Sequence, residues 1–224
     1  MDLKQAMNER HSVRSYRNQP IETEKAEALD AFIQECNQKG DLHIQLVLNE
    51  PKAFDSFMAH YGKFSGVQNY IALVGKKSKD LQEKIGYYGA AIMLRAQALG
   101  LNTCWVALTY KKVKAAFTVD KGEKLCSVLA VGYGQTQGKP HKGKTLEEAS
   151  SSAITPAPDW FIRGVNAALL APTAMNQQKF QLALLDNHTV QVSAKSGFYT
   201  KMDMGIVKYF FELGAEEEDF VWKK

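Results

Sequence analysis

Cysteine is scarce in this chain of 224 residues, and its three copies lie far apart. Cys36, Cys104 and Cys126 are odd in number and never show CxxC spacing. A disulfide framework needs paired cysteines and a cysteine zinc site needs closely spaced ones, so the sequence favours neither. We therefore expect reduced thiols, which are typical of a cytoplasmic protein.

Long hydrophobic runs are missing as well. No stretch of the sequence approaches the roughly 20 consecutive apolar residues that a membrane helix needs. The segment 1–10 carries charges throughout and lacks the apolar centre of a signal peptide. The sequence therefore predicts a soluble protein that is not exported and has no membrane partner.

A strong charge imbalance is also absent. The 28 basic and 24 acidic residues leave a net charge of +4, spread along the chain. Without a basic face this balance predicts no nucleic-acid partner, although it suits anionic small molecules. Hydrophobic residues make up 45% and charged residues 23%, which is typical of an ordinary folded domain and excludes a disordered chain.

The common catalytic motifs are not found. The sequence has no HExxH, GxSxG or Walker-type run, which disfavours hydrolases and nucleoside triphosphatases. His43, His60, His141 and His188 show no spacing typical of metal ligands, so we expect no metal site. The Gly132-Tyr133-Gly134 run lacks the third glycine of a Rossmann turn, so a nicotinamide cofactor is not expected to bind in that way.

Apolar periodicity predicts an α+β fold. The predicted helices cover residues 1–10, 22–38, 54–61, 81–99, 159–170 and 203–215. The predicted strands cover residues 42–48, 70–74, 104–108, 125–132, 180–184 and 190–192. The stretch 135–158 is rich in glycine, proline and serine and lacks periodicity. We interpret it as a crossover within a single domain, between a first half at about 1–134 and a second half at about 159–224.

Hydrogen-bond donors are dense at the end of the first predicted helix, in the run Arg10-His11-Ser12-Val13-Arg14-Ser15-Tyr16-Arg17. Guanidinium and hydroxyl groups in this density suit a phosphate or a carboxylate. The alternative is a set of solvated charges at a helix C-terminus, where cations are favoured.

Two further segments are candidates for ligand binding. The run from Pro172 to Gln178 carries a hydroxyl and several amides, which together can donate to and accept from the edge of a heterocycle. A simple helix-terminating turn would also explain it. Lys139, His141, Lys142 and Lys144 form a basic cluster, and most such clusters are only solvated loops.

Three motifs together resemble the FMN-dependent nitroreductase family. They are Arg10-His11-Ser12-Val13-Arg14, the helix that runs into Gly100-Leu101-Asn102-Thr103-Cys104-Trp105, and Ala171-Pro172-Thr173-Ala174-Met175-Asn176-Gln177-Gln178. The resemblance covers nearly the whole chain. It implies a nitroreductase-like fold in which a mixed, mainly antiparallel sheet is flanked by helices.

The order of the motifs departs from ordinary family members. There the A-P-S/T loop soon follows the arginine motif, and flavin sites form between two subunits, whereas here the loop lies beyond the crossover. The chain therefore resembles the single-chain, pseudo-dimeric branch of nitroreductases, in which two unequal halves imitate the homodimer. This implies a monomer with one intramolecular flavin site, with a homodimer as the alternative.

The resemblance also implies which residues bind FMN. From the first half these are Arg10, His11, Ser12 and Arg14, with Lys63 near the pyrimidine and a backbone amide of the Trp105–Val106 segment near the hydride-accepting nitrogen. From the second half they are Pro172, Thr173, Ala174, Asn176 and Gln178, with Lys142 and Lys144 as a basic phosphate pair. No catalytic side chain is implied, because the flavin performs the chemistry.

The implied activity is reduction of a nitroaromatic, a quinone or a similar small acceptor by two electrons from NAD(P)H. One alternative is a protein that binds or carries FMN without significant turnover. Another is a module that binds a different anion through residues 10–17. The visible spectrum of the purified protein and its response to a reduced nicotinamide separate these three.

Overall fold

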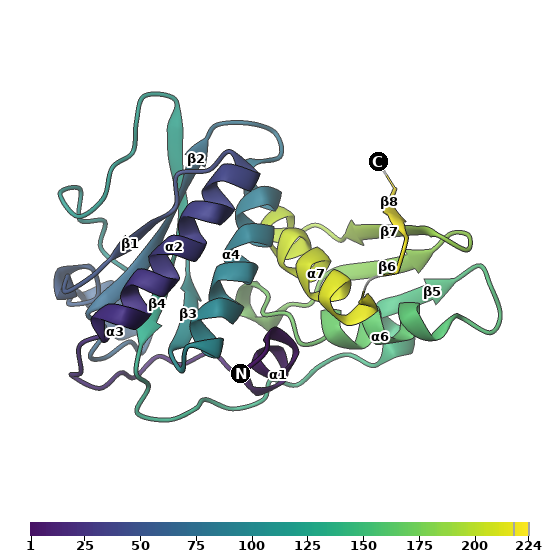
Figure 1. The fold of residues 1–224 in the computed structure, drawn as a ribbon, viewed down its shortest axis with the longest axis horizontal. Helices are drawn as coiled ribbons and strands as arrows, with labels where there is room; N and C mark the ends of the chain where they lie inside the picture. Colours follow the sequence, from purple (N-terminus) through teal and green to yellow (C-terminus); the bar gives the residue numbers. More distant parts are fainter. Residues whose placement is uncertain (217, 224) are drawn as a thin grey trace. The chain divides into compact units, whose positions relative to one another are not determined.

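The computed structural model describes residues 1–216 and 218–223, and these divide into two compact units (Figure 1). The first unit comprises Met1–Leu81 and Ala91–Pro140. The second comprises Gln82–Ala90 and the chain from His141 onward. The change of unit near residue 140 falls inside the stretch interpreted as a crossover. The grouping of residues 82–90 with the second unit has no counterpart in the sequence patterns.

A four-stranded antiparallel sheet forms the centre of the first unit. Its strands are β1 (Gln45–Val47), β2 (Asn69–Lys76), β3 (Asn102–Val106) and β4 (Glu123–Gly132), arranged in the order β1-β2-β4-β3. The central strand β2 is buried along all but its last residue, as its continuous apolar run predicts. β3 lies at an edge of the sheet, which leaves its outer backbone groups open to another segment.

The helices of the first unit follow the apolar spacing of the sequence. They are α1 (Leu3–Glu9), α2 (Thr23–Gly40), α3 (Phe57–Tyr61) and the C-terminal part of α4 (Leu81–Ala98). Gly100 follows α4 with a φ of +80°, the left-handed conformation in which glycine commonly ends helices. One face of the sheet carries a core cluster in which Tyr70, Ala72, Val128 and Ala130 are buried.

The second unit contains a smaller mixed sheet. Its elements are α5 (Leu146–Ala149), β5 (Ser150–Ser152), α6 (Asp159–Ala168), β6 (Phe180–Leu184), β7 (Thr189–Ala194), α7 (Thr200–Ala215) and β8 (Val221–Trp222). The strand order is β5-β6-β7-β8, with β6 and β7 antiparallel and both outer pairs parallel. The observed α+β architecture confirms the predicted fold class.

Several elements differ from the sequence prediction, among them the strand predicted at 42–48, which covers only Gln45–Val47, and β8, which was not predicted. The stretch 135–158 is not free of structure, because Thr145 caps α5 through a reciprocal capping box with Glu148 and the triple serine pairs with β6 as β5. α7 begins at Thr200, three residues before its predicted start at 203. α3 covers only Phe57–Tyr61.

Two glycines allow α7 to lie very close to the N-terminal part of α4 inside the second unit. A Cβ atom on Gly86 would lie 2.0 Å from the carbonyl oxygen of Met202, and one on Gly205 would lie 2.0 Å from that of Glu83. Real Cβ atoms do not approach a carbonyl so closely. Glycine at both positions is therefore required by the contact of the two helix backbones.

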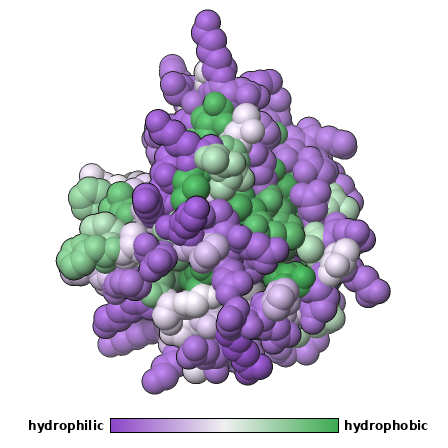
Figure 2. Space-filling view, turned by 90° about the vertical axis from the view of Figure 1, so that its left-hand side faces the viewer, coloured by the Kyte–Doolittle hydropathy of each residue, from purple (hydrophilic) through white to green (hydrophobic). Residues whose placement is uncertain are grey.

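α3 exposes most of its apolar side chains. Phe57 is 82% exposed and Tyr61 is 76% exposed, whereas Ala59 is buried in the core cluster. Figure 2 views the side of the molecule on which α3 lies, and green hydrophobic areas interrupt its mainly purple surface.

Among the described residues, no helix is both long and apolar enough to cross a membrane.

Candidate functional site

The arginine-rich segment is fixed in the first unit by backbone hydrogen bonds to three neighbouring segments. The Val13 amide donates to the carbonyl oxygen of Thr103 at 3.1 Å, along the open edge of β3. The Tyr16 amide donates to the carbonyl of Ser65 at 2.9 Å, and the Arg17 amide donates to that of Tyr133 at 2.8 Å. Because Val13 and Tyr16 are buried, the segment is part of the folded unit and not a solvated helix end.

Arg10 is the most unusual residue of this segment. Its side chain is only 4% exposed, and its Nε and Nη1 atoms are buried without a hydrogen-bond partner among residues 1–216 and 218–223. Burial lowers the pKa of the guanidinium to about 10, so the group still carries its charge at neutral pH. A buried, unpaired charge is costly unless an anion or a set of acceptors satisfies it. The arrangement therefore suits an anionic ligand.

Cys104 does not supply that anion. Burial raises the pKa of the Cys104 thiol, and the charges of Arg14 and Arg10 oppose this rise without cancelling it. The thiol is therefore protonated at neutral pH, and it is neither a counter-charge for Arg10 nor an activated nucleophile.

β3, which pairs with the arginine segment, carries two further polar groups: the side chain of Thr103 and the backbone of its open edge. The hydroxyl of Thr103 is buried and finds no hydrogen-bond partner in the part of the chain that the structure describes. The Thr103 carbonyl faces Val13 and so points away from β4. Peptide groups alternate along a strand, so the amide of Trp105 faces the same open edge while that of Val106 faces β4. Of the two amides predicted to contact a ligand, the geometry favours Trp105.

Lys63 lies near the arginine-rich segment, because the next residue, Phe64, contacts Arg14. It is exposed and has a φ of +60°, and it precedes Phe64, over whose ring the Arg14 guanidinium lies at 5.7 Å. The Ser65 amide donates to the Arg14 carbonyl at 3.0 Å. The structure therefore brings the loop after α3 beside the predicted donors of the first unit.

The loop after α6 is held in the second unit by a buried carboxylate. Asp203, on α7, is 6% exposed. It accepts hydrogen bonds from the Ala174 amide at 3.0 Å and from Nε2 of Gln177 at 2.8 Å. Burial raises the pKa of Asp203, and these two hydrogen bonds oppose the rise. Met175 and Asn176 adopt positive φ angles of 51° and 53° in this loop, so Asp203 stabilises a constrained turn.

The same loop is tied to the basic segment at residues 142–144. Nδ2 of Asn176 and Nε2 of Gln178 donate to the carbonyl oxygen of Lys142 at 3.0 and 2.8 Å. Oε1 of Gln178 accepts from the Lys144 amide at 2.9 Å. These bonds place Lys142 and Lys144 beside Asn176 and Gln178, as the family resemblance predicts.

The predicted site residues thus form two sets, each within one unit. The first set is Arg10, His11, Ser12, Arg14, Lys63, Trp105 and Val106. The second set is Lys142, Lys144, Pro172, Thr173, Ala174, Asn176 and Gln178. Sequence reasoning did not identify Thr103 or Asp203 as part of these sets, because a buried threonine in a strand and an aspartate in a helix have no distinctive local signal.

One family model matches residues 2–215 of the chain, and this family is described as "Putative TM nitroreductase". No curated protein matches the chain.

Solved structures share the fold. A structure from Thermotoga maritima, described as a putative nitroreductase, has 20% identity and a TM-score of 0.69, and the match covers 96% of this chain and 83% of that one. A putative NADH dehydrogenase/NAD(P)H nitroreductase from Parabacteroides distasonis has 20% identity and a TM-score of 0.51, over 65% of this chain and 95% of that one. A nitroreductase family protein from Streptococcus pneumoniae has 11% identity and a TM-score of 0.52, and the match covers 66% of this chain and 98% of that one.

Proposed function

Because the chain belongs to the "Putative TM nitroreductase" family, a family of oxidoreductases, we propose that it binds FMN and reduces small electron acceptors with NAD(P)H. The acceptors would be nitroaromatics, quinones or similar molecules. The observation that carries the proposal is the buried Arg10 guanidinium with two unpartnered nitrogen atoms. A phosphate offers such a guanidinium charge-assisted, bidentate hydrogen bonds.

The first set of residues fits the polar parts of FMN. Arg10 would bind the phosphate, and the exposed Ser12 and Arg14 would donate to the ribityl chain and to the pyrimidine edge. Positive charge from Arg14 and Lys63 near the pyrimidine would stabilise the negative charge of the reduced cofactor. The Trp105 amide would donate a hydrogen bond to the hydride-accepting nitrogen from the open edge of β3.

The second set would contribute in a different way. The side-chain amides of Asn176 and Gln178 form hydrogen bonds to the Lys142–Lys144 segment and to each other. They would therefore hold the lysines and the loop in place, which leaves Lys142, Lys144, Pro172, Thr173 and Ala174 as the residues of this set available to contact a cofactor. Since each set occurs once in the sequence, we infer one FMN per chain.

When bound, FMN would supply the two-electron transfer from a reduced nicotinamide to the acceptor. The protein binds the cofactor, orients it and adjusts its electrostatic surroundings. A side-chain nucleophile is not needed, which agrees with the protonated state of the Cys104 thiol.

The test is the visible spectrum of the purified full chain, followed by anaerobic mixing with NADH or NADPH. We expect a yellow protein with one FMN per chain whose absorbance near the flavin maximum bleaches with either nucleotide and recovers with a quinone. A yellow protein that does not bleach would instead be an FMN carrier. A colourless protein that does not take up added FMN would contradict the proposal.

A further inference from the structure

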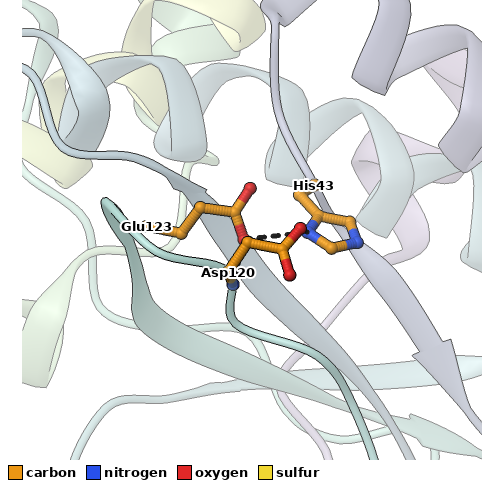
Figure 3. A group of neighbouring side chains, drawn as sticks. All are labelled: His43, Asp120 and Glu123. Atoms are coloured by element: carbon orange, nitrogen blue, oxygen red, sulfur yellow. Dashed lines mark hydrogen bonds and ion pairs between the residues drawn. The ribbon is translucent and has the colours of Figure 1, made fainter.

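A histidine and two carboxylates meet in the first unit, far from the arginine-rich segment in sequence. Nδ1 of His43 lies 2.9 Å from Oε2 of Glu123 and 3.9 Å from Oδ2 of Asp120. The three ligand atoms all lie within 4.8 Å of one another (Figure 3). His43 precedes β1, Glu123 begins β4, and Asp120 lies in the turn between β3 and β4.

We propose that His43, Asp120 and Glu123 bind a divalent transition-metal ion, with Zn²⁺ as the best fit. Zinc accepts imidazole nitrogen and carboxylate oxygen as ligands at about 2.0–2.1 Å. In a tetrahedral site these bond lengths place neighbouring ligand atoms about 3.3 Å apart. The observed separations of 2.9 and 3.9 Å lie on either side of that value, so small side-chain rotations would complete the site.

The backbone on both sides of the site is already held in place. The His43 amide donates to the Val74 carbonyl at 3.0 Å, and the amide of the next residue, Ile44, donates to the Asn37 side chain at 2.8 Å. The Asp120 amide donates to Oε2 of Glu123 at 2.8 Å, and the Glu123 amide donates to the Asp120 carbonyl at 3.0 Å. Metal binding therefore has to order only side chains, which lowers its entropic cost.

The charge and accessibility of the three groups also suit a metal ion. The Asp120 side chain is 66% exposed and that of His43 is 34% exposed, so an ion can reach them from solvent, whereas Glu123 is only 9% exposed. Two carboxylates with a neutral imidazole balance the charge of a divalent ion. Lys76 lies opposite Glu123 in the β2–β4 register, but its ammonium group is bound by Asp41 at 3.0 Å. A metal at Nδ1 would replace the present contact of Nδ1 with Oε2 of Glu123.

Calorimetric titration of the metal-free full chain with Zn²⁺ tests this site. We expect one ion per chain. Because loss of a group that only supports a metal ligand already lowers metal affinity about 10- to 100-fold, removal of a ligand should lower it at least about 100-fold in His43→Ala and at least about 10-fold in Asp120→Asn. Asp120 is exposed, so its variant is expected to fold even if His43→Ala does not. His60→Asn, which changes an exposed histidine on α3, should bind Zn²⁺ like the wild type.

A second readout identifies the ligand atom. Zinc should shift the ¹⁵N resonance of Nδ1 of His43 and leave Nε2 protonated. Absence of Zn²⁺ binding in the wild type, equal binding in Asp120→Asn, or an unchanged His43 spectrum would overturn the proposal. None of these results depends on FMN.

Discussion

Nε2 of Gln178 donates a hydrogen bond of 2.8 Å to the carbonyl oxygen of Lys142, while its Oε1 accepts one of 2.9 Å from the Lys144 amide. Nε2 also donates to Oδ1 of Asn176 at 2.9 Å. The amide is 4% exposed and its donors and acceptor are in use, so it joins the basic segment to the loop. Its role is to position Lys142 and Lys144.

Gln178→Ala should therefore lower FMN affinity about 10-fold without direct loss of a cofactor contact. The reason is that the lysine segment and its loop lose three hydrogen bonds, each worth roughly 0.5–1.5 kcal/mol. Fluorescence titration with FMN measures the change. Gln191→Ala, on β7 of the same unit, is the matched control and should bind FMN like the wild type.

Replacing the unpartnered hydroxyl of Thr103 should stabilise the flavin-free protein. Thr103→Val removes a buried polar atom that has no hydrogen-bond partner, and we expect a gain of about 1 kcal/mol in the free energy of unfolding. The same change at Thr145 removes the side-chain cap of α5 and should cost about 1 kcal/mol. Urea unfolding of both variants checks the opposite signs. A loss of stability in Thr103→Val would show that the hydroxyl has a structural partner.

The close contact between α4 and α7 predicts that Gly205→Ala is severely destabilising. The new Cβ would lie 2.0 Å from the Glu83 carbonyl oxygen, so the two helices would have to separate, at a cost of about 3 kcal/mol. A Cβ added at Gly143 would meet no heavy atom of the described residues within 4 Å, so Gly143→Ala should be neutral or slightly stabilising. Thermal unfolding compares the two. Equal melting temperatures would contradict the observed helix contact.

Asp203 should make the stability of the protein depend on pH. Burial raises its pKa above the ordinary value of 3.8, so the folded state binds this proton more tightly than the unfolded state. The stability contributed by the group is therefore greatest at low pH, falls as the pH rises from about 3.8 through the raised pKa, and is constant above it.

Asp203→Asn removes this titration. We expect the free energy of unfolding of the wild type, taken relative to that of the variant, to fall over this pH range, as measured by urea unfolding at several pH values. A difference that rises with pH would mean that the pKa is lowered instead. At neutral pH the variant should also weaken FMN binding, because an amide cannot accept both the Ala174 and the Gln177 hydrogen bonds in the same geometry.

The sequence predicted those parts of the fold that depend on local pattern. The buried run of β2 and the periodic helices α2 and α4 lie close to their predicted positions, because apolar spacing determines them. The strand Ser150–Ser152 was missed because three polar residues form a strand only through pairing with β6. The capping pair Thr145 and Glu148 was the one local signal in that stretch.

The residues of the candidate site, like the fold, could be predicted from the sequence only in part. The sequence identifies the donors of the arginine-rich segment, since their density is visible in eight consecutive residues. It does not show that the Arg10 guanidinium is buried, because burial depends on residues distant in sequence, such as Cys104, that lie beside Arg10 only in the fold. Likewise, the meeting of His43 with Asp120 and Glu123 depends on sheet register and not on histidine spacing.

The FMN affinity of Arg10→Ala is the decisive measurement for cofactor binding at the arginine-rich segment. Loss of a charge-assisted contact with the phosphate, worth roughly 1.5–3 kcal/mol, should raise the dissociation constant about 10- to 150-fold. Arg17→Ala, an exposed arginine of the same segment, is the control and should bind FMN like the wild type. We expect weakened FMN binding in an Arg10→Ala variant whose circular dichroism spectrum is native. Unchanged affinity in a folded Arg10→Ala protein would contradict it.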